Sequence, residues 1–363
     1  MATTSTTTPS GLISMAERPF SARERLGVWI RDRWRWEHCL RDPTRRYLSL
    51  ANRSESLEPA PDGSGFACRW TFTSRLHAAQ VQPRLGQRLL RRCLSDAPIT
   101  RQSAPADVPA AALWDTPEIS VLIGHRGLER LPLLLTTLES LAAQQDVRLE
   151  CLVIEQDCES RVASRLPGWV RHLHAPLSDS SAPYNRSHTF NAGARAALAP
   201  VLLLHDNDML VPNGYCHRIL QRIAQGYAVV NPKRFIFYLK QQHSQQVMER
   251  SAACEATPAD YIVQNLEAGG SMAITTAGFE AIGGMDEAFS GWGGEDNEFW
   301  DRCLTLPTWI WGYEPIVHLW HSSQPLKQTA DNPNLRRARE VMACPAPQRI
   351  RSLRQRRKDG HGS

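Results

Sequence analysis

Short apolar runs alternate with longer amphipathic stretches through the middle of the sequence. Three of these runs, at residues 119–123, 149–155 and 201–206, are rich in β-branched and aliphatic side chains and predict buried strands. A stretch with helical periodicity, residues 132–141, begins with a proline, which is favoured in the first turn of a helix. Strands that alternate with helices indicate parallel β-α-β units. The sequence therefore predicts an α/β fold.

Polar side chains stand at the end of each predicted strand. They are His125 and Arg126 after the first strand, Glu155 and Asp157 at the second, and Asp206 and Asp208 at the third. Parallel strands present their carboxyl ends at one edge of a sheet, and ligands of α/β proteins bind there. We therefore expect these six residues to lie along one edge and to take part in binding.

The rest of the sequence divides into parts of different composition. Residues 1–20 are predicted to be disordered, and residues 21–115 form an accessory region, rich in Arg and Trp, that ends in a Pro/Ala-rich linker. Packing of its Arg and Trp on the main domain is favoured, and a module that binds an acceptor or a partner is the alternative. The main domain is predicted to span residues 116–330, and residues 331–363 form a basic C-terminal helix or tail.

Bulk properties narrow the class of protein. A length of 363 residues allows an enzyme-sized core, and the net charge of +5 fits anionic substrates such as nucleotide diphosphates better than nucleic acid. No apolar run is long enough to cross a bilayer, and the nine cysteines lack paired spacing. We therefore expect a cytoplasmic protein. A solvated tail is favoured for residues 331–363, and peripheral contact with the anionic inner face of the membrane is the alternative.

Two motifs have the composition of a metal site. Asp206-Asn207-Asp208 places two carboxylates one residue apart after a buried strand, where they could hold a divalent cation beside diphosphate oxygens. His318 and His321 are three residues apart and could face one ion, and carboxylate with imidazole suits Mn²⁺ better than Mg²⁺. An ordinary acidic turn and a pair of packed histidines beside tryptophans are the alternatives.

A glycine-rich acidic segment lies between these two motifs. Two glycine pairs, Gly269-Gly270 and Gly283-Gly284, precede Trp292-Gly293-Gly294-Glu295-Asp296. A tryptophan face suits stacking on a sugar ring, and adjacent carboxylates suit hydroxyl recognition and proton abstraction. A structural turn followed by an acidic helix start explains the same residues, and both interpretations can hold together.

Taken in order, these motifs resemble a known family. Residues 119–321 resemble the GT-A glycosyltransferases of family 2, and their second half resembles the C-terminal motif of β-1,4-galactosyltransferases and of bacterial chondroitin-type polymerases. Residues 184–193, beginning Tyr184-Asn185-Arg186, are similar to the family segment whose aromatic and Arg contact uridine diphosphate. His318 and His321 match a Met and a His that hold manganese in the galactosyltransferases.

The resemblance implies a fold and a mechanism. It implies a GT-A fold, with a mixed, mostly parallel sheet flanked by helices, and a metal-dependent transfer from a UDP-sugar to a glycan or glycolipid hydroxyl. Asp208, His321 and His318 would hold Mn²⁺ or Mg²⁺. Asp296 would be the general base of an inverting displacement, with Glu295 holding the acceptor, since related retaining enzymes carry Asn at the position of Asp296. The donor-binding residues would be His125, Arg126, Glu155, Asp157, Tyr184, Arg186, Asp206, Gly270 and Trp292.

Two departures from the family pattern leave the sugars open. Asn297 stands where the galactosyltransferases usually have a third acid, and Glu267 stands where they have a donor-selecting Tyr. Galactose, N-acetylgalactosamine, N-acetylglucosamine and glucuronic acid all remain candidates for the donor sugar. A metal-dependent phosphoesterase and a non-catalytic carbohydrate-binding protein are the alternative functions.

Overall fold

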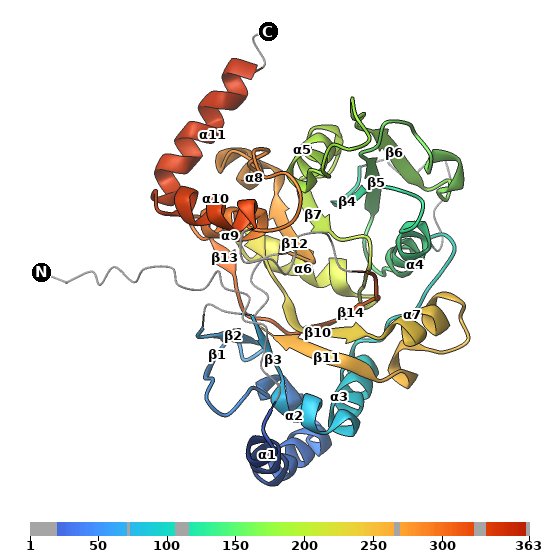
Figure 1. Ribbon diagram of the computed structural model, residues 1–363, viewed down its shortest axis with the longest axis vertical. Helices are drawn as coiled ribbons and strands as arrows, with labels where there is room; N and C mark the ends of the chain where they lie inside the picture. Colours follow the sequence, from blue (N-terminus) through green and yellow to red (C-terminus); the bar gives the residue numbers. More distant parts are fainter. Residues whose placement is uncertain (1–19, 71–72, 106–115, 265–268, 323–331, 361–363) are drawn as a thin grey trace, which may run out of the picture.

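The computed structural model describes residues 20–70, 73–105, 116–264, 269–322 and 332–360 (Figure 1). Three features singled out in the sequence lie wholly or mostly outside these ranges. They are the N-terminal segment before Phe20, most of the Pro/Ala-rich linker, and Glu267.

A seven-stranded sheet forms the centre of the molecule. Its strands lie in the order β13 (Thr308–Trp309), β9 (Val229–Val230), β12 (Ser271–Thr275), β7 (Val201–His205), β4 (Ile119–His125), β5 (Leu149–Glu155) and β6 (Val170–His174). Only β12 runs antiparallel to its neighbours β7 and β9, and every other pairing in this sheet is parallel. The three predicted strands are confirmed as β4, β5 and β7. The predicted α/β class, with a mixed and mostly parallel sheet, is confirmed as well.

Both faces of the sheet are covered, which explains why its strands are continuously apolar. Along β4, Val121 and Ile123 belong to one apolar cluster, and Leu122 between them belongs to another. The first cluster includes side chains from α4 (Leu131–Ala142) and α6 (Tyr215–Ala224). The second includes side chains from α5 (Arg186–Ala196), α8 (Thr276–Ala281) and α9 (Glu295–Cys303). Alternate residues of one strand thus pack on opposite layers of helices.

A smaller sheet brings residues far apart in the chain to the edge of the central one. Its order is β3 (Ser74–Arg75), β11 (Ala259–Gln264), β10 (Lys233–Leu239), β14 (Glu314–His318) and β8 (Met209–Leu210). Strand β8 follows Asp208 directly, and β14 ends at His318, which pairs with Met209. The backbone N–H of Leu319 also donates to the Asp208 carbonyl at 2.9 Å. This register places the two predicted metal motifs side by side. Helix α7 (Gln241–Met248) and the 3-10 turn η4 (Cys254–Ala256) lie between β10 and β11 in the chain, and another 3-10 turn, η3 (Ala163–Arg165), lies between β5 and β6 of the central sheet.

The N-terminal region packs on the smaller sheet. It contains α1 (Ala22–Arg41), η1 (Arg46–Ser49), the hairpin β1 (Leu57–Pro59) and β2 (Phe66–Cys68), α2 (His77–Val81) and α3 (Pro83–Asp96). Strand β3 extends the sheet beside β11, and the buried Arg234 of β10 donates to the carbonyls of Leu48 and Leu50. Trp36 is buried, whereas Trp29 and Trp34 are exposed. One face of α1 therefore packs inward, and another faces solvent.

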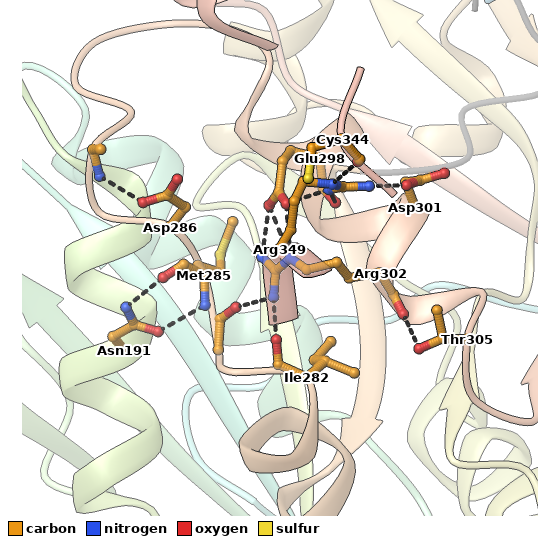
Figure 2. A network of polar contacts seen from close by, with 12 residues as sticks. Asn191, Ile282, Met285, Asp286, Glu298, Asp301, Arg302, Thr305, Cys344 and Arg349 are labelled. Atoms are coloured by element: carbon orange, nitrogen blue, oxygen red, sulfur yellow. Dashed lines mark hydrogen bonds and ion pairs between the residues drawn. The ribbon is translucent and has the colours of Figure 1, made fainter. Parts of the chain in front are cut away.

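The basic C-terminal segment forms two helices, α10 (Pro333–Met342) and α11 (Ala346–Gly360), at the end of the molecule opposite α1 (Figure 1). Figure 2 shows how α11 meets α9: Arg349 contacts both Glu298 and Asp301, and its Nε donates to the Cys344 carbonyl at 2.9 Å. Glu298 also accepts from the fully buried Arg302 at 2.6 Å. Arg349 is thus buried rather than solvated, because its charge is matched by carboxylates of α9.

Two further structural observations bear on the sequence analysis. All nine cysteines are free, which agrees with the absence of paired spacing. Among the helices that the structure describes, none combines the length and apolar character needed to cross a bilayer.

Candidate active site

The Asp206-Asn207-Asp208 turn lies where β7 leaves the central sheet. Its backbone is tied to the neighbouring strand: the Asp206 N–H donates to the Gly270 carbonyl at 2.8 Å, and the Gly270 N–H donates to Asp206 Oδ2 at 3.1 Å. Asn207 is held from the other side, since its amide nitrogen lies 3.0 Å from His125 Nδ1. The turn therefore has fixed contacts to both β12 and β4.

Three ligand-type side chains converge beside this turn. Nitrogen and oxygen atoms of Asp208, His318 and His321 all lie within 4.8 Å of one another. His321 Nε2 is 3.3 Å and His318 Nε2 is 3.7 Å from the Asp208 carboxylate. One carboxylate and two imidazoles form a donor set that suits a first-row divalent ion, Mn²⁺ included, so these residues fit the implied metal. The structure thus brings together the two motifs that sequence spacing left separate.

Arg130, at the start of α4, reaches the same three-residue cluster. Its Nη1 lies 3.6 Å from Asp208 Oδ2, and its Nη2 lies 2.8 Å from His321 Nδ1. His321 Nδ1 also lies 2.6 Å from the Ser322 carbonyl oxygen, so this ring nitrogen stands between a guanidinium and a backbone oxygen. Arg130 was missed in the sequence because it follows the predicted strand by seven residues, in a segment with no motif of its own.

Arg186 connects the D-x-D turn to the acidic segment of α9. From the first turn of α5, its Nε and Nη2 donate to Asp206 Oδ1 at 3.0 and 2.7 Å, and its Nη1 donates to Asp296. The guanidinium also lies over the Phe190 ring, 4.6 Å from its centroid. Burial lowers the pKa of Arg186, but the charges of Asp206, Asp296 and Glu295 outweigh this effect and hold the pKa well above its ordinary value. Arg186 is therefore a permanent cation between two carboxylates.

Glu295 and Asp296 occupy the first turn of α9, where the helix dipole favours negative charge. Burial raises the pKa of Glu295 to about 7, and Asp296 beside it contributes to the increase. Burial also raises the pKa of Asp296, while Arg186 opposes the shift. Within the described residues, Glu295 Oε2 is buried and has no hydrogen-bond partner. The two carboxyl groups therefore differ: one bonds to Arg186, and the other has an oxygen left for a ligand.

The glycine pair before β12 allows Asp296 to lie close to the backbone. Gly269 has a φ of +77°, and a Cβ at this position would stand 2.7 Å from Asp296 Oδ2. A side chain would thus be strained by its backbone conformation and would also collide with the carboxylate. This close approach is a physical reason for glycine in the pair, which the sequence suggested only in general terms.

Lys233 is a charged residue of this site that the sequence analysis did not single out. It begins β10, and its Nζ donates to the Ser271 carbonyl at 2.6 Å. Burial lowers its pKa to about 7, although the charges of Asp296 and Asp206 act in the opposite direction. The only signal in the sequence is a lysine at the edge of an apolar run, and such residues are common at strand ends.

His125, Arg126 and Tyr184 hold the loops around the D-x-D turn. His125 is buried and bonds to the Gly127 carbonyl through Nε2, at 2.8 Å, as well as to Asn207. Arg126 donates to the carbonyls of Ser180 and Ala182 at 2.6 Å. Tyr184 Oη lies 3.2 Å from Thr189 Oγ1. His125 and Arg126 thus connect the carboxyl end of β4 to neighbouring loops, and Tyr184 contacts α5.

Glu155 and Asp157, at the end of β5, have protein partners on the side of β6. Glu155 accepts from the backbone N–H of Arg161 and lies 2.8 Å from His172 Nε2. Asp157 pairs with the Arg161 side chain.

Trp292 lies before α9 and is held through its backbone, since its carbonyl accepts from Asn332 at 3.1 Å and from Asn334 at 3.4 Å. The predicted donor residues thus divide into those around Arg186 and those that bond to peripheral loops.

A cavity of ≈ 330 Å³ opens beside the metal-ligand cluster, between α4 and α7. Its lining includes His321 of the cluster and Arg130, which contacts His321. Trp320, which is 40% exposed, lies on the same wall, and its backbone N–H donates to Ser244 Oγ at 2.7 Å. The cluster therefore adjoins open space large enough for part of a small ligand.

Residues 250–314 match the family model described as the N-terminal domain of galactosyltransferase. This match supports a glycosyltransferase. The matched stretch contains both glycine pairs and the segment from Trp292 to Asp296. It covers a minor part of the chain and does not include the D-x-D turn, His318 or His321. No curated protein matches the sequence.

Two solved structures are among those to which the chain is similar. One is the catalytic domain of Drosophila beta1,4-galactosyltransferase 7 in complex with xylobiose, with 15% identity, 61% of this chain and 80% of that chain covered, and a TM-score of 0.34. The other is GalNAc-T7 with UDP, GalNAc and Mn²⁺, with 16% identity, 62% and 49% coverage, and a TM-score of 0.43. The chain thus spans about half the length of the GalNAc-T7 chain.

Proposed function

We propose that this protein is an inverting GT-A glycosyltransferase that moves a sugar from a UDP-sugar to a hydroxyl of a glycan or glycolipid. The observation that carries the proposal is the position of Arg186, which contacts Asp206 of the D-x-D turn and Asp296 of α9 at once. A donor-binding turn and a candidate base thereby share one site. Asp208, His318 and His321 add a cluster suited to the metal that such a donor needs.

Each charged residue has a separate task in the proposed reaction. The Asp296 carboxylate accepts the proton of the acceptor hydroxyl while that oxygen forms a bond to the anomeric carbon of the donor. The bond from this carbon to the diphosphate oxygen breaks on the opposite face, and UDP leaves with the electron pair. Because burial raises the pKa of Asp296, its carboxylate is a stronger base than an exposed aspartate.

The other acid of α9 suits acceptor recognition. With a pKa of about 7, Glu295 is partly protonated near neutral pH, so its buried carboxyl can both donate to and accept from sugar hydroxyls. Arg186 holds Asp296 in place and offers positive charge to the donor. The remaining predicted donor residues are His125, Arg126, Glu155, Asp157, Tyr184, Gly270 and Trp292.

Asp208, His321 and His318 would hold Mn²⁺, or Mg²⁺ in its place. The ion would supply positive charge to the diphosphate as it departs. Arg130 stands within reach of the same carboxylate, so its guanidinium would stabilise Asp208 whenever the ion is absent. The donor sugar remains one of the four candidates suggested by the resemblance.

Two alternative functions make different use of these residues. A two-metal phosphoesterase needs ligands for a second ion, and within the described part of the chain one three-ligand cluster is present. A non-catalytic carbohydrate-binding protein needs no base, so the pairing of Asp296 with Arg186 would be incidental. A transferase accounts for both the single cluster and the acid that pairs with Arg186.

The proposal is tested by measuring thermal stability with Mn²⁺ and each of the four UDP-sugars, because a ligand that binds the folded state raises its stability. We expect Mn²⁺ to bind with one ion per chain and to enhance the effect of one UDP-sugar. His321→Ala should weaken Mn²⁺ binding by at least about tenfold, whereas His217→Ala on α6 should leave it unchanged. Two ions per chain would favour the phosphoesterase, and no stabilisation by any UDP-sugar would contradict the proposal.

A further inference from the structure

The outer face of α1 carries large apolar side chains that the fold leaves in solvent. Leu26, Ile30 and Trp34, spaced four residues apart, are 58%, 54% and 77% exposed, and Trp29 beside them is 45% exposed. Residues four apart lie on one side of a helix, so these side chains form a continuous stripe. We call these four residues the α1 stripe. An exposed apolar stripe of this size indicates an interaction surface.

The charges around the α1 stripe are positive. Four arginines of the helix are exposed beside it: Arg23, Arg25, Arg31 and Arg33. The guanidinium of Arg33 lies 5.6 Å from the centroid of the Trp29 ring. The apolar side chains of the α1 stripe thus alternate with arginines along the exposed face of the helix.

The acidic residues of α1 have partners away from this face. Asp32 is buried and pairs with Arg35 at 2.8 Å. Glu37 pairs with Arg88 at 2.9 Å. Glu24 forms the capping box with Ser21 at the start of the helix. Every acid of α1 is therefore occupied, and positive charges outnumber negative ones on the outer face.

From this pattern we infer that the outer face of α1 docks on an anionic membrane surface, with the α1 stripe in the headgroup region and the arginines on lipid phosphates. Tryptophan is favoured at that depth because its ring is apolar and its N–H is polar. Basic residues near an anionic leaflet attract it electrostatically. A single helix with bulky apolar side chains between arginines has the composition of interfacial helices. This inference goes beyond the proposed transferase activity and does not depend on it.

Helix α1 differs from the basic C-terminal helix α11 in its exposed apolar side chains. The two helices lie at opposite ends of the long axis of the molecule (Figure 1). Helix α11 turns Arg349 and Leu353 inward, and none of its large apolar residues is among the exposed ones. The α1 stripe therefore has the apolar component that α11 lacks.

The test is co-sedimentation of the full chain with vesicles of phosphatidylcholine alone or mixed with phosphatidylglycerol. We expect binding only to the anionic vesicles, weakened by salt. Arg31→Gln with Arg33→Gln, and separately Ile30→Ser with Trp34→Ser, should each lower the partition coefficient about tenfold or more. Leu198→Ser and Leu304→Ser, which change exposed apolar residues elsewhere, should leave it unchanged.

Three results would overturn the inference. One is the absence of binding to either kind of vesicle. Another is loss of binding in Arg351→Gln with Arg354→Gln, on α11, but not in the α1 variants. The third is a dimer in solution that dissociates on Trp34→Ser, which would assign the stripe to a second copy of the chain. Because no arm of the test measures sugar transfer, failure here leaves the proposed transferase activity untouched.

Discussion

Arg186 lies between two carboxylates that have different tasks in the proposed reaction. It is 20 residues from Asp206 and 110 residues from Asp296 in the chain, yet its guanidinium contacts both. Under the proposed function, donor binding at Asp206 and proton transfer at Asp296 would be electrostatically coupled, because both carboxylates share the charge of Arg186. The same guanidinium opposes the increase in the pKa of Asp296 that burial causes, although the pKa stays above its ordinary value.

Glu295 gives this site a distinct dependence on pH. Its pKa is about 7 in the folded protein, against an ordinary value of 4.5. Between these values the folded state holds a proton that the unfolded chain has lost, so the free energy of unfolding decreases as pH rises through this window. Glu295→Gln removes the titrating group. We therefore expect the variant to exceed the wild type in stability above pH 7, by roughly 1–3 kcal/mol, and to match it below pH 4.5.

Urea unfolding at several pH values measures this difference, and the exposed Glu280→Gln on α8 is the matched control. A Glu295→Gln curve parallel to that of the wild type at every pH would show that Glu295 titrates normally.

At the scale of elements, the central strands were predictable, and the smaller sheet was not. The apolar runs of β4, β5 and β7 are local features, because a strand covered on both faces needs apolar residues at every position. The smaller sheet depends on pairing between β10, β11, β14, β8 and β3, which are far apart in the sequence. No local pattern encodes that pairing. For this reason the spacing of the motifs did not join His318 to Asp208. The family resemblance assigned them to one ion, and the register of β14 with β8 brings them together.

Helix α11 packs against α9, the helix that carries Glu295 and Asp296. Arg349 bonds to Glu298 and Asp301, three and six residues beyond Glu295 in the chain. Arg349→Met would leave Glu298 with Arg302 as its remaining arginine partner and Asp301 without its bond to α11. We expect a loss of about 2 kcal/mol in the free energy of unfolding, since hydrogen bonds to charged groups contribute this much.

The matched control for this variant is Arg351→Met, because Arg351 lies exposed on the same helix. Urea unfolding of the two variants should separate them clearly. Equal stability would mean that the contact between α11 and α9 adds nothing to the fold.

At the scale of the whole molecule, the positions of Arg130 and Lys233 show the limit of prediction from sequence. Both lie among the carboxylates of the site, yet neither belongs to a recognisable motif. Their roles follow from the folding of a loop after β4 and of a strand from the second sheet around the end of β7. The acids at the end of β5 show the converse: Glu155 and Asp157 were expected at the same edge, and their partners lie toward β6. The end of a predicted strand shows which edge of the sheet a residue lies at, but it does not predict which neighbours its side chain will contact.

Two basic surfaces, on α1 and on α11, lie at opposite ends of the molecule, and composition alone could not distinguish their roles. The arginines of α11 are partly used to hold α9, and those of α1 accompany an exposed apolar stripe at the other end of the long axis (Figure 1). For residues 331–363, the sequence pattern favoured a solvated tail, and contact with a membrane was the alternative interpretation. The burial of Arg349 explains why part of that charge serves the fold instead.

The measurement that tests the central claim most directly is sugar transfer by Asp296→Asn in the presence of Mn²⁺ and the UDP-sugar that stabilises the wild type. An amide has nearly the shape of the carboxylate but cannot accept the acceptor proton as a base. We predict a loss of transfer on the order of 10²-fold or more, with thermal stabilisation by the donor retained. Full transfer activity in Asp296→Asn would contradict the assignment of Asp296 as the general base.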